Sequence, residues 1–176
     1  INPHFLYNTL DMINWYAWNN SGREIISIVE HLAKFYKLSL SSGKDIITIG
    51  EELEHVLCYF EIQKMRFGNL ILHINVEEII KKYNILKTTL QPIVENAILH
   101  GILYKESKSG SVTISGALLN GVIELTVSDD GIGIPEEKLA LLQKNKVSTK
   151  GNRGYGIKNV KDRIQLHYGN EYGLIF

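Results

Sequence analysis

The chain has 176 residues, 44% of them hydrophobic and 22% charged, so it can bury a core of one to one and a half ordinary domains. Its 19 Lys and Arg balance its 19 Asp and Glu, which leaves no basic excess for binding nucleic acid. No apolar run reaches the roughly 18 residues that cross a bilayer, and the single cysteine, Cys58, excludes an intrachain disulfide. We therefore expect a soluble stretch in a reducing compartment, without a nucleic-acid partner.

The first 43 residues carry two helical patterns. Leu6, Leu10, Ile13 and Ala17 recur at helical spacing, and a second helix follows the polar break at residues 19–22. A lone hairpin of this size cannot bury both of its apolar stripes, whereas pairing with a second copy would close a four-helix bundle. The pattern therefore predicts a helical hairpin that forms a homodimer.

A polar, turn-rich stretch at residues 41–45 separates this hairpin from the rest of the chain, so we predict one unit at 1–43 and another at 44–176. The second unit alternates between helical spacing and the period of two that is typical of strands. Asn120-Gly121 is the dipeptide favoured in a two-residue hairpin turn. The predicted elements are helices at 50–67, 88–100 and 157–168, a short helix from Pro135, and strands at 70–76, 112–118 and 123–127.

These alternating elements predict an α+β fold, in which the helical hairpin precedes an α/β sandwich. The chain opens on Ile1 and stops inside residues 173–176, which have the pattern of a strand just beginning. We therefore expect the fold to be truncated at both ends, with C-terminal strands missing.

Two glycine pairs lie where a strand meets a helix. In Asp129-Asp130-Gly131-Ile132-Gly133, the glycines let a flat ligand approach the backbone, and Asp129 can accept a hydrogen bond from an exocyclic amine such as that of adenine. A tight turn would use the same residues. In Gly154-Tyr155-Gly156, the glycines precede a helix whose free N–H groups suit a phosphate. Lys150 lies just upstream, in a basic stretch typical of either a lid or a solvated loop.

Asn96 and His100 are one helical turn apart, which predicts that they share a face of their helix. Asn96 has an amide oxygen of the kind that Mg²⁺ accepts alongside phosphates. The chain contains no G-x-x-x-x-G-K-[ST] and no complete G-x-G-x-x-G, which excludes the P-loop and dinucleotide folds. A different nucleotide fold is required.

Asn96-Ala97, Asp129-x-Gly131-x-Gly133 and Gly154-x-Gly156 are similar, in this order, to the N, G1 and G2 boxes of the GHKL ATP-binding fold. That fold is shared by histidine kinases, gyrase, Hsp90 and MutL. The opening Ile1-Asn2-Pro3-His4-Phe5-Leu6-Tyr7-Asn8 resembles the phosphoacceptor box of LytS/YesM-like sensor histidine kinases, and so do Glu95-Asn96-Ala97 and His100-Gly101. The resemblance covers essentially the whole chain.

This resemblance implies that His4 is phosphorylated by Mg-ATP, which agrees with the chemistry of an imidazole that is mostly neutral at pH 7. Asn8, one turn later, corresponds to a position associated with orienting water when a response regulator is dephosphorylated. Phe5 stands where many histidine kinases have an acidic base, which leaves Glu95 as a candidate proton acceptor. Pro92 stands where the gyrase, Hsp90 and MutL branches carry a glutamate that activates water, so hydrolysis is disfavoured.

We therefore hypothesise a two-component sensor histidine kinase that autophosphorylates on His4 and passes the phosphoryl group to an aspartate of a response regulator. By resemblance, Asp129, Gly131 and Gly133 bind adenine, Asn96 holds Mg²⁺, His100 and Lys150 lie near phosphate, and Gly154 and Gly156 shape a lid. The resemblance also implies the cytoplasmic portion of a bacterial cell-membrane protein. Two alternatives are a non-catalytic ATP-sensing dimerisation module and a GHKL ATPase.

Overall fold

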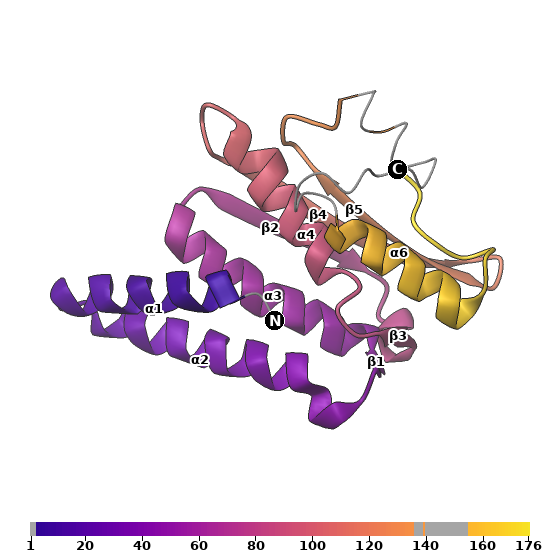
Figure 1. Cartoon of the computed structure of the whole chain (residues 1–176), viewed down its shortest axis with the longest axis horizontal. Coiled ribbons are helices and arrows are strands. Elements are labelled where there is room, and N and C mark those ends of the chain that lie inside the picture. The colour runs from indigo at the N-terminus through magenta and orange to yellow at the C-terminus, as the bar shows by residue number, and fades with distance from the viewer. Residues whose placement is uncertain (1–2, 136–138, 140–154) are drawn as a thin grey trace.

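The computed structural model describes residues 3–135, 139 and 155–176 (Figure 1). It contains a helical hairpin, a small antiparallel ribbon and a three-stranded sheet with helices packed on it. The hairpin consists of α1 (Pro3–Trp18) and α2 (Gly22–Leu40), as the sequence predicted. The other helices and strands are β1 (Ile46–Thr48), α3 (Ile49–Phe67), β2 (Leu70–Val76), β3 (Asn84–Leu86), α4 (Gln91–Asn96), β4 (Gly110–Leu119), β5 (Val122–Asp129) and α6 (Tyr155–Tyr168).

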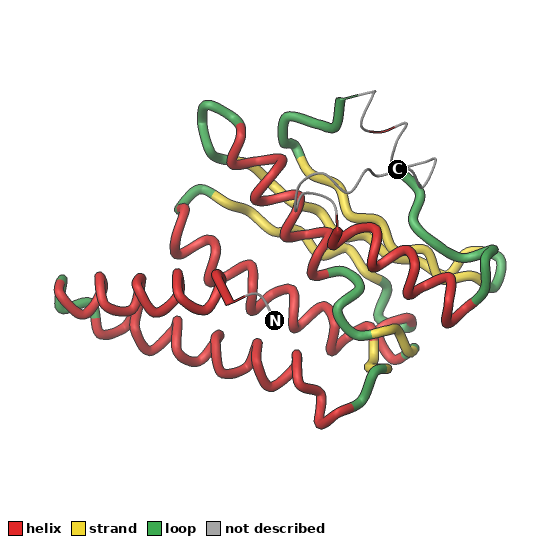
Figure 2. The backbone as a smooth tube through the Cα atoms, viewed as in Figure 1, coloured by secondary structure: helices red, strands yellow, loops and turns green. Residues whose placement is uncertain are grey.

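The sheet has the strand order β2-β4-β5, with β2 parallel to β4 and β4 antiparallel to β5. Its tight turn places both Asn120 and Gly121 at positive φ, which confirms the predicted hairpin turn. Val112 and Ile114 of β4 are fully buried, whereas their neighbours Thr113 and Ser115 are partly exposed. The helices therefore cover one face of the sheet, as Figure 2 shows.

Helix α3 is the centre of the fold and packs against α2, α4 and β2. It starts at a capping box, in which the Thr48 hydroxyl accepts the Glu51 N–H (3.1 Å) and the Glu51 carboxylate accepts the Thr48 N–H (2.7 Å). It ends at Gly68, whose φ is 84°. One hydrophobic core runs from the hairpin through α3 to the sheet, so the two predicted units are packed together.

The hairpin packs on α3 through an aromatic cluster. The Phe5 ring lies 5.0 Å from that of Phe35 and 5.1 Å from that of Tyr59, and His55 stacks on Phe35 at 4.4 Å. The sequence led us to expect a second copy to cover the hairpin, but α3 of the same chain covers one of its faces. Apolar side chains remain exposed on both helices, among them Tyr7, Leu10, Ile26 and Val29.

Two sequence predictions are corrected by the structure. The helix predicted at residues 88–100 is shorter, because Thr88 has a φ of 58° and Pro92 occupies the first turn of α4. A π-helical turn, Ala97–Gly101, then follows α4. Residues 173–176 form no strand, because no described strand provides their backbone with a hydrogen-bonding partner. The short helix predicted from Pro135 lies largely outside the described residues.

Among the described residues, no helix combines the length and the apolar content that crossing a bilayer requires.

His55 is a residue of α3 whose imidazole is buried against α2 of the hairpin, with 3% of its surface exposed. The Ser39 hydroxyl donates its one proton to the Phe35 carbonyl (2.9 Å). Its oxygen therefore accepts the hydrogen bond from His55, so Nε2 is the protonated ring nitrogen (2.8 Å). Burial lowers the pKa of His55 from 6.5 to about 4. The folded chain therefore binds fewer protons than the unfolded chain at pH values between these two.

Because of this difference in proton binding, stability should fall as the pH drops from 6.5 to 4, and His55 alone accounts for about 3 kcal/mol of that loss. Replacing His55 by Gln keeps a donor for Ser39 and removes the titration. Urea unfolding of His55→Gln across this range should give a pH dependence shallower by that amount. Parallel profiles for the wild type and the variant would contradict the burial of a neutral imidazole.

Candidate functional site

His4 is the second residue of α1 and is exposed, whereas its neighbour Phe5 is buried. Because Phe5 is fixed between Phe35 and Tyr59, the imidazole of His4 is directed away from the core. The side-chain amide nitrogen of Asn8 lies 3.0 Å from His4 Nδ1, so the predicted one-turn relation is an actual contact. An exposed, neutral imidazole has the chemistry of a nucleophile toward a phosphoryl group.

The second group of predicted residues begins on α4 with Asn96. Its side-chain amide donates to the Pro92 carbonyl at 2.6 Å, which fixes the side chain and leaves the amide oxygen as an available acceptor. Gly156, at the start of α6, lies beside it: a Cβ on Gly156 would be 3.9 Å from Asn96 Nδ2 and 3.7 Å from Pro92 Cβ. The fold therefore brings together Asn96 and one glycine of the second pair, which are 60 residues apart in the sequence.

The first glycine pair follows Asp129 at the end of β5, and the Asp129 carboxylate lies between Gly131 and Gly101. Asp129 Oδ1 accepts the Gly131 N–H at 2.9 Å, and a Cβ on Gly101 would approach the same oxygen to 2.6 Å. A Cβ on Gly131 would be only 2.4 Å from the Gly101 carbonyl carbon. Gly133 has a φ of 74°, which favours glycine. The turn after β5 thus packs directly on the π-helical turn after α4.

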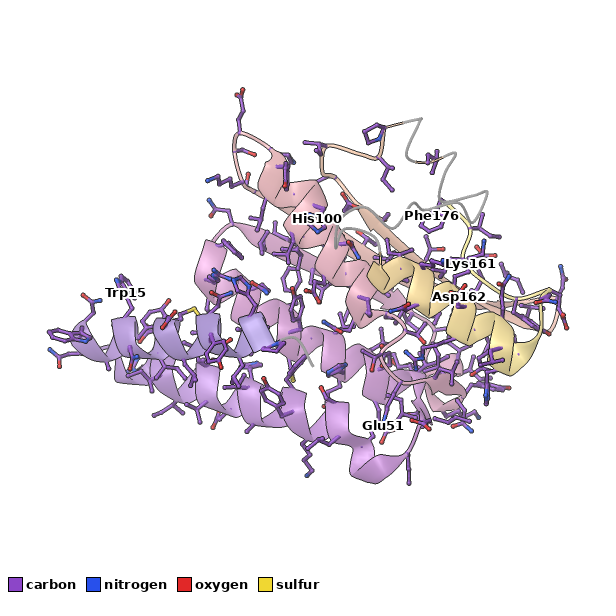
Figure 3. All side chains as sticks on the ribbon, in the orientation of Figure 1. Trp15, Glu51, His100, Lys161, Asp162 and Phe176 are labelled. Carbon is purple, nitrogen blue, oxygen red and sulfur yellow. The ribbon has the colours of Figure 1, made fainter. Side chains whose placement is uncertain are left out.

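His100 is exposed on that π-helical turn, with its ring 6.2 Å from the ring of Tyr104. Figure 3 shows it on the helical segment that lies over the sheet. The sequence predicted a regular helix through Asn96 and His100, but His100 lies in the π turn that follows α4; that the two residues share a face stays a prediction. Glu95 is partly buried and accepts the Gln91 side-chain amide at 2.9 Å. Lys150 and Gly154 lie outside the described residues.

Two residues of this region were not predicted as part of the site. Gly101 entered the sequence prediction only within the His100-Gly101 resemblance, without a role of its own, yet it provides the space for the Asp129 carboxylate. Glu52 of α3 is fully buried and accepts the backbone N–H groups of Thr88, Leu90 and Gln91, which form the entry to α4. The position of Gly101 after His100 was a usable signal, but nothing in the local pattern singles out Glu52.

This site suits a purine nucleotide better than a bare metal ion. Asp129 Oδ2 has no hydrogen-bond partner among the described residues, and the carboxylate lies against Gly101 and Gly131, which have no side chains to cover it. The described part of the chain contains no cluster of His, Cys, Asp and Glu that could hold a metal by itself. Asn96 has one available oxygen, which fits an ion that is held mainly by the phosphates of a nucleotide.

The fold and site define a nucleotide-binding α/β sandwich preceded by a helical hairpin with an exposed histidine. The family described as "Histidine kinase-, DNA gyrase B-, and HSP90-like ATPase" matches residues 82–172, and the family described as "Histidine kinase" matches residues 1–71. The chain belongs to the histidine kinase-, DNA gyrase B- and HSP90-like ATPase family, which implies ATP binding.

The curated relatives carry names of the same kind. The chain is 38% identical to the sensor histidine kinase YesM of Bacillus subtilis over 99% of its length, and 32% identical to the sensor protein LytS of Oceanobacillus iheyensis over 97%. It spans 29% and 31% of those proteins. A solved blue-light-activated histidine kinase of Erythrobacter litoralis aligns with a TM-score of 0.46 at 18% identity, over 93% of this chain and 55% of that one.

Proposed function

We propose that the chain is the autokinase portion of a two-component sensor, and that it transfers the γ-phosphoryl group of ATP to His4. The observation that carries this proposal is the exposed His4 imidazole, present in the same chain as the Asp129 and Asn96 site of an ATP-binding family. The names of the relatives, which are sensor histidine kinases and sensor proteins, support the same activity.

Asp129 would accept a hydrogen bond from the adenine amine through Oδ2. Gly131 lets the turn pack closely on Gly101, and Gly133, with open space beside its Cα, would admit the ring against the backbone. Asn96 would contribute its amide oxygen to Mg²⁺. Bound with ATP, that ion would neutralise charge on the phosphates. We assign the phosphate region to His100 and Lys150, and the lid to Gly154 and Gly156.

In the transfer step, a ring nitrogen of His4 forms a bond to the γ-phosphorus as the bond from phosphorus to the bridging oxygen of ADP breaks. The imidazole loses its N–H proton to a base, for which Glu95 is our candidate. ADP leaves with the bonding electron pair. The chain contributes mainly by holding the two reactants in line.

Kinase activity is favoured over hydrolysis because of Pro92. This residue lies in the first turn of α4, and its carbonyl accepts the Asn96 amide. It has no side-chain group that could activate water, whereas the hydrolytic branches of the fold carry a glutamate at that position. An ATPase is therefore the weaker of the two candidates.

We further propose that phosphorylated His4 passes its phosphoryl group to an aspartate of a response regulator. Asn8 would orient water for the opposing activity, hydrolysis of the phosphorylated response regulator, which agrees with its contact to His4. We also propose that the whole protein is anchored in a bacterial cell membrane, with this portion in the cytoplasm.

The proposal is tested by incubating the chain with Mg²⁺ and γ-labelled ATP. Label should appear on the protein and should be lost in acid but kept in alkali, as expected of a phosphorus–nitrogen bond. Steady release of inorganic phosphate without label on the protein would indicate the ATPase. Tight ATP binding without either result would indicate the non-catalytic sensing module.

We propose that the exposed apolar residues of α1 and α2 pair with a second copy of the chain. Leu10 is 44% exposed and Ile26 is 60% exposed, so a glutamate at either position would have to be desolvated in the dimer but not in the monomer. Sedimentation should give the wild type twice its chain mass of 20.0 kDa. Leu10→Glu and Ile26→Glu should weaken dimerisation by more than about tenfold.

Leu119→Glu is the matched control, because Leu119 is similarly exposed at the β4–β5 turn and should not affect the mass. A monomeric wild type at high concentration would contradict the pairing, and so would equal dimerisation of all the variants.

A further inference from the structure

Asp130 follows Asp129 directly, but its carboxylate is held by a different part of the fold. Its Oδ1 accepts the Ser111 N–H at 3.0 Å and the Lys105 ammonium at 3.2 Å, and its Oδ2 accepts the Ser111 hydroxyl at 3.1 Å. The Asp130 N–H in turn donates to the Ser111 carbonyl at 3.2 Å. Asp130 is thus fixed to the start of β4 and to the segment after the π-helical turn.

A glycine makes this attachment possible. A Cβ on Gly110 would lie 2.2 Å from Asp130 Oδ1, so any side chain there would displace the carboxylate. The Ser111 N–H, together with the Lys105 ammonium, holds the pKa of Asp130 below its usual value. The side chain therefore stays ionised at neutral pH, and its contacts with Ser111 and Lys105 all favour the charged form.

The neighbouring carboxylate of Asp129 is held on the opposite side of the turn. It lies over Gly101, and the Ile132 N–H donates to the Gly101 carbonyl at 3.3 Å. The turn after β5 is therefore fixed at two points. Asp130 attaches it to β4, and the Gly101 carbonyl of the π-helical turn accepts its Ile132 N–H. Loss of either point would let the Asp129 carboxylate shift.

We propose that Asp130 is a positioning residue that orients Asp129 toward the exocyclic amine of adenine, and that it thereby determines the preference for ATP over GTP. This inference rests on the proposed role of Asp129 in ATP binding. Adenine presents an amine donor at the position where guanine presents the O6 acceptor. A fixed carboxylate accepts from the first and repels the second, whereas a shifted carboxylate distinguishes them less well.

The test compares ATP and GTP dissociation constants, measured by calorimetry on the whole chain. Asp130→Asn keeps the size of the side chain and removes its charge. We expect the ATP constant to rise by about fivefold, with little change for GTP, because the lost interactions act through Asp129. Lys105→Met should act in the same direction, by about twofold. Asp162→Asn, an exposed change on α6 labelled in Figure 3, is the matched control and should alter neither constant.

Gly101→Ala tests the other point of attachment. Gly101 has a φ of −97°, which alanine adopts, so the effect comes from the Cβ placed 2.6 Å from Asp129 Oδ1. The preference for ATP should fall by about tenfold or more. Because alanine also crowds the turn, Lys105→Met supplies the measurement if Gly101→Ala fails to fold.

Equal weakening of ATP and GTP in Asp130→Asn and Lys105→Met would reduce Asp130 to a structural residue and overturn the inference. The same holds if both variants keep the ATP preference of the wild type. After either of these two outcomes, the proposed function would still stand if the wild-type chain binds ATP and becomes labelled on His4. A wild-type chain that binds no ATP would overturn the inference and the proposed function together.

Discussion

Replacing His4 by glutamine is expected to reduce the acid-labile label from γ-labelled ATP to background, while ATP binding stays unchanged. Glutamine is close to histidine in size and polarity and suits a helix, but its amide nitrogen is no nucleophile at neutral pH. His4 is exposed, so the change should leave the fold intact. The measurement is protein-bound label after quenching in alkali, alongside calorimetric ATP binding.

The matched control for His4→Gln is His73→Gln, because His73 is also exposed but lies on β2. This variant should be labelled as the wild type is. Label that persists in His4→Gln would show that another residue accepts the phosphoryl group. Label lost in both variants would point to a general defect in the protein rather than to the acceptor.

The elements with local signals were the ones that the sequence predicted well. Helix α3 begins with the capping pair Thr48 and Glu51 and has a glycine just past its end, so its bounds differ from the prediction by one residue. The β4–β5 hairpin has Asn120-Gly121 at its turn and alternating side chains on both strands. Such signals act over a few residues, which is why they can be read without the fold.

The features that the sequence did not reveal depend on contacts between distant segments. The hairpin looked unable to cover its apolar faces without a second copy, because no local pattern shows that Phe5 and Phe35 meet Tyr59 of α3. The π-helical turn after α4 has no periodicity of its own. Gly101 had no predicted role beyond the His100-Gly101 resemblance, because its packing depends on Asp129, 28 residues later.

For the site, too, local signals were predicted and contacts between distant segments were not. The residue types and their order pointed to an adenine nucleotide, and the structure brings Asn96 next to Gly156 and places Asp129 over Gly101. The residues that hold these groups in place were not predicted. Asp130 and Glu52 act on segments that are respectively 19 and more than 35 residues away in the chain.

Loss of the Glu52 side chain should destabilise the fold strongly. Its carboxylate has none of its surface exposed and accepts the N–H groups of Thr88 and Leu90 at 2.8 Å and of Gln91 at 3.3 Å. Burial raises the pKa of this carboxyl, and the backbone N–H donors of residues 88–91 oppose that rise. Arg163 of α6 donates to the Thr88 carbonyl, so residues 87–91 are held from two sides.

Glu52→Ala would leave these buried N–H groups without an acceptor and open a cavity. Since each unsatisfied donor costs roughly 1–3 kcal/mol, the free energy of unfolding should fall by at least about 3 kcal/mol. Residues 87–91 lead into α4, so the variant should also bind ATP more weakly at temperatures where it is still folded. Urea unfolding and calorimetric ATP binding measure the two effects.

Glu54→Ala on the same helix is the control for Glu52→Ala. Glu54 forms an ion pair with Lys34 at 2.5 Å, but its side chain is 44% exposed, so the loss of this pair should change the free energy of unfolding only slightly. Glu52→Gln should fall between the two, because the amide keeps one acceptor oxygen and turns a donor toward the remaining N–H groups. Equal stability of Glu52→Ala and Glu54→Ala would contradict the anchoring of α4 by Glu52. If Glu52→Ala is less stable but binds ATP as tightly as the wild type, Glu52 stabilises the fold without contributing to the nucleotide site.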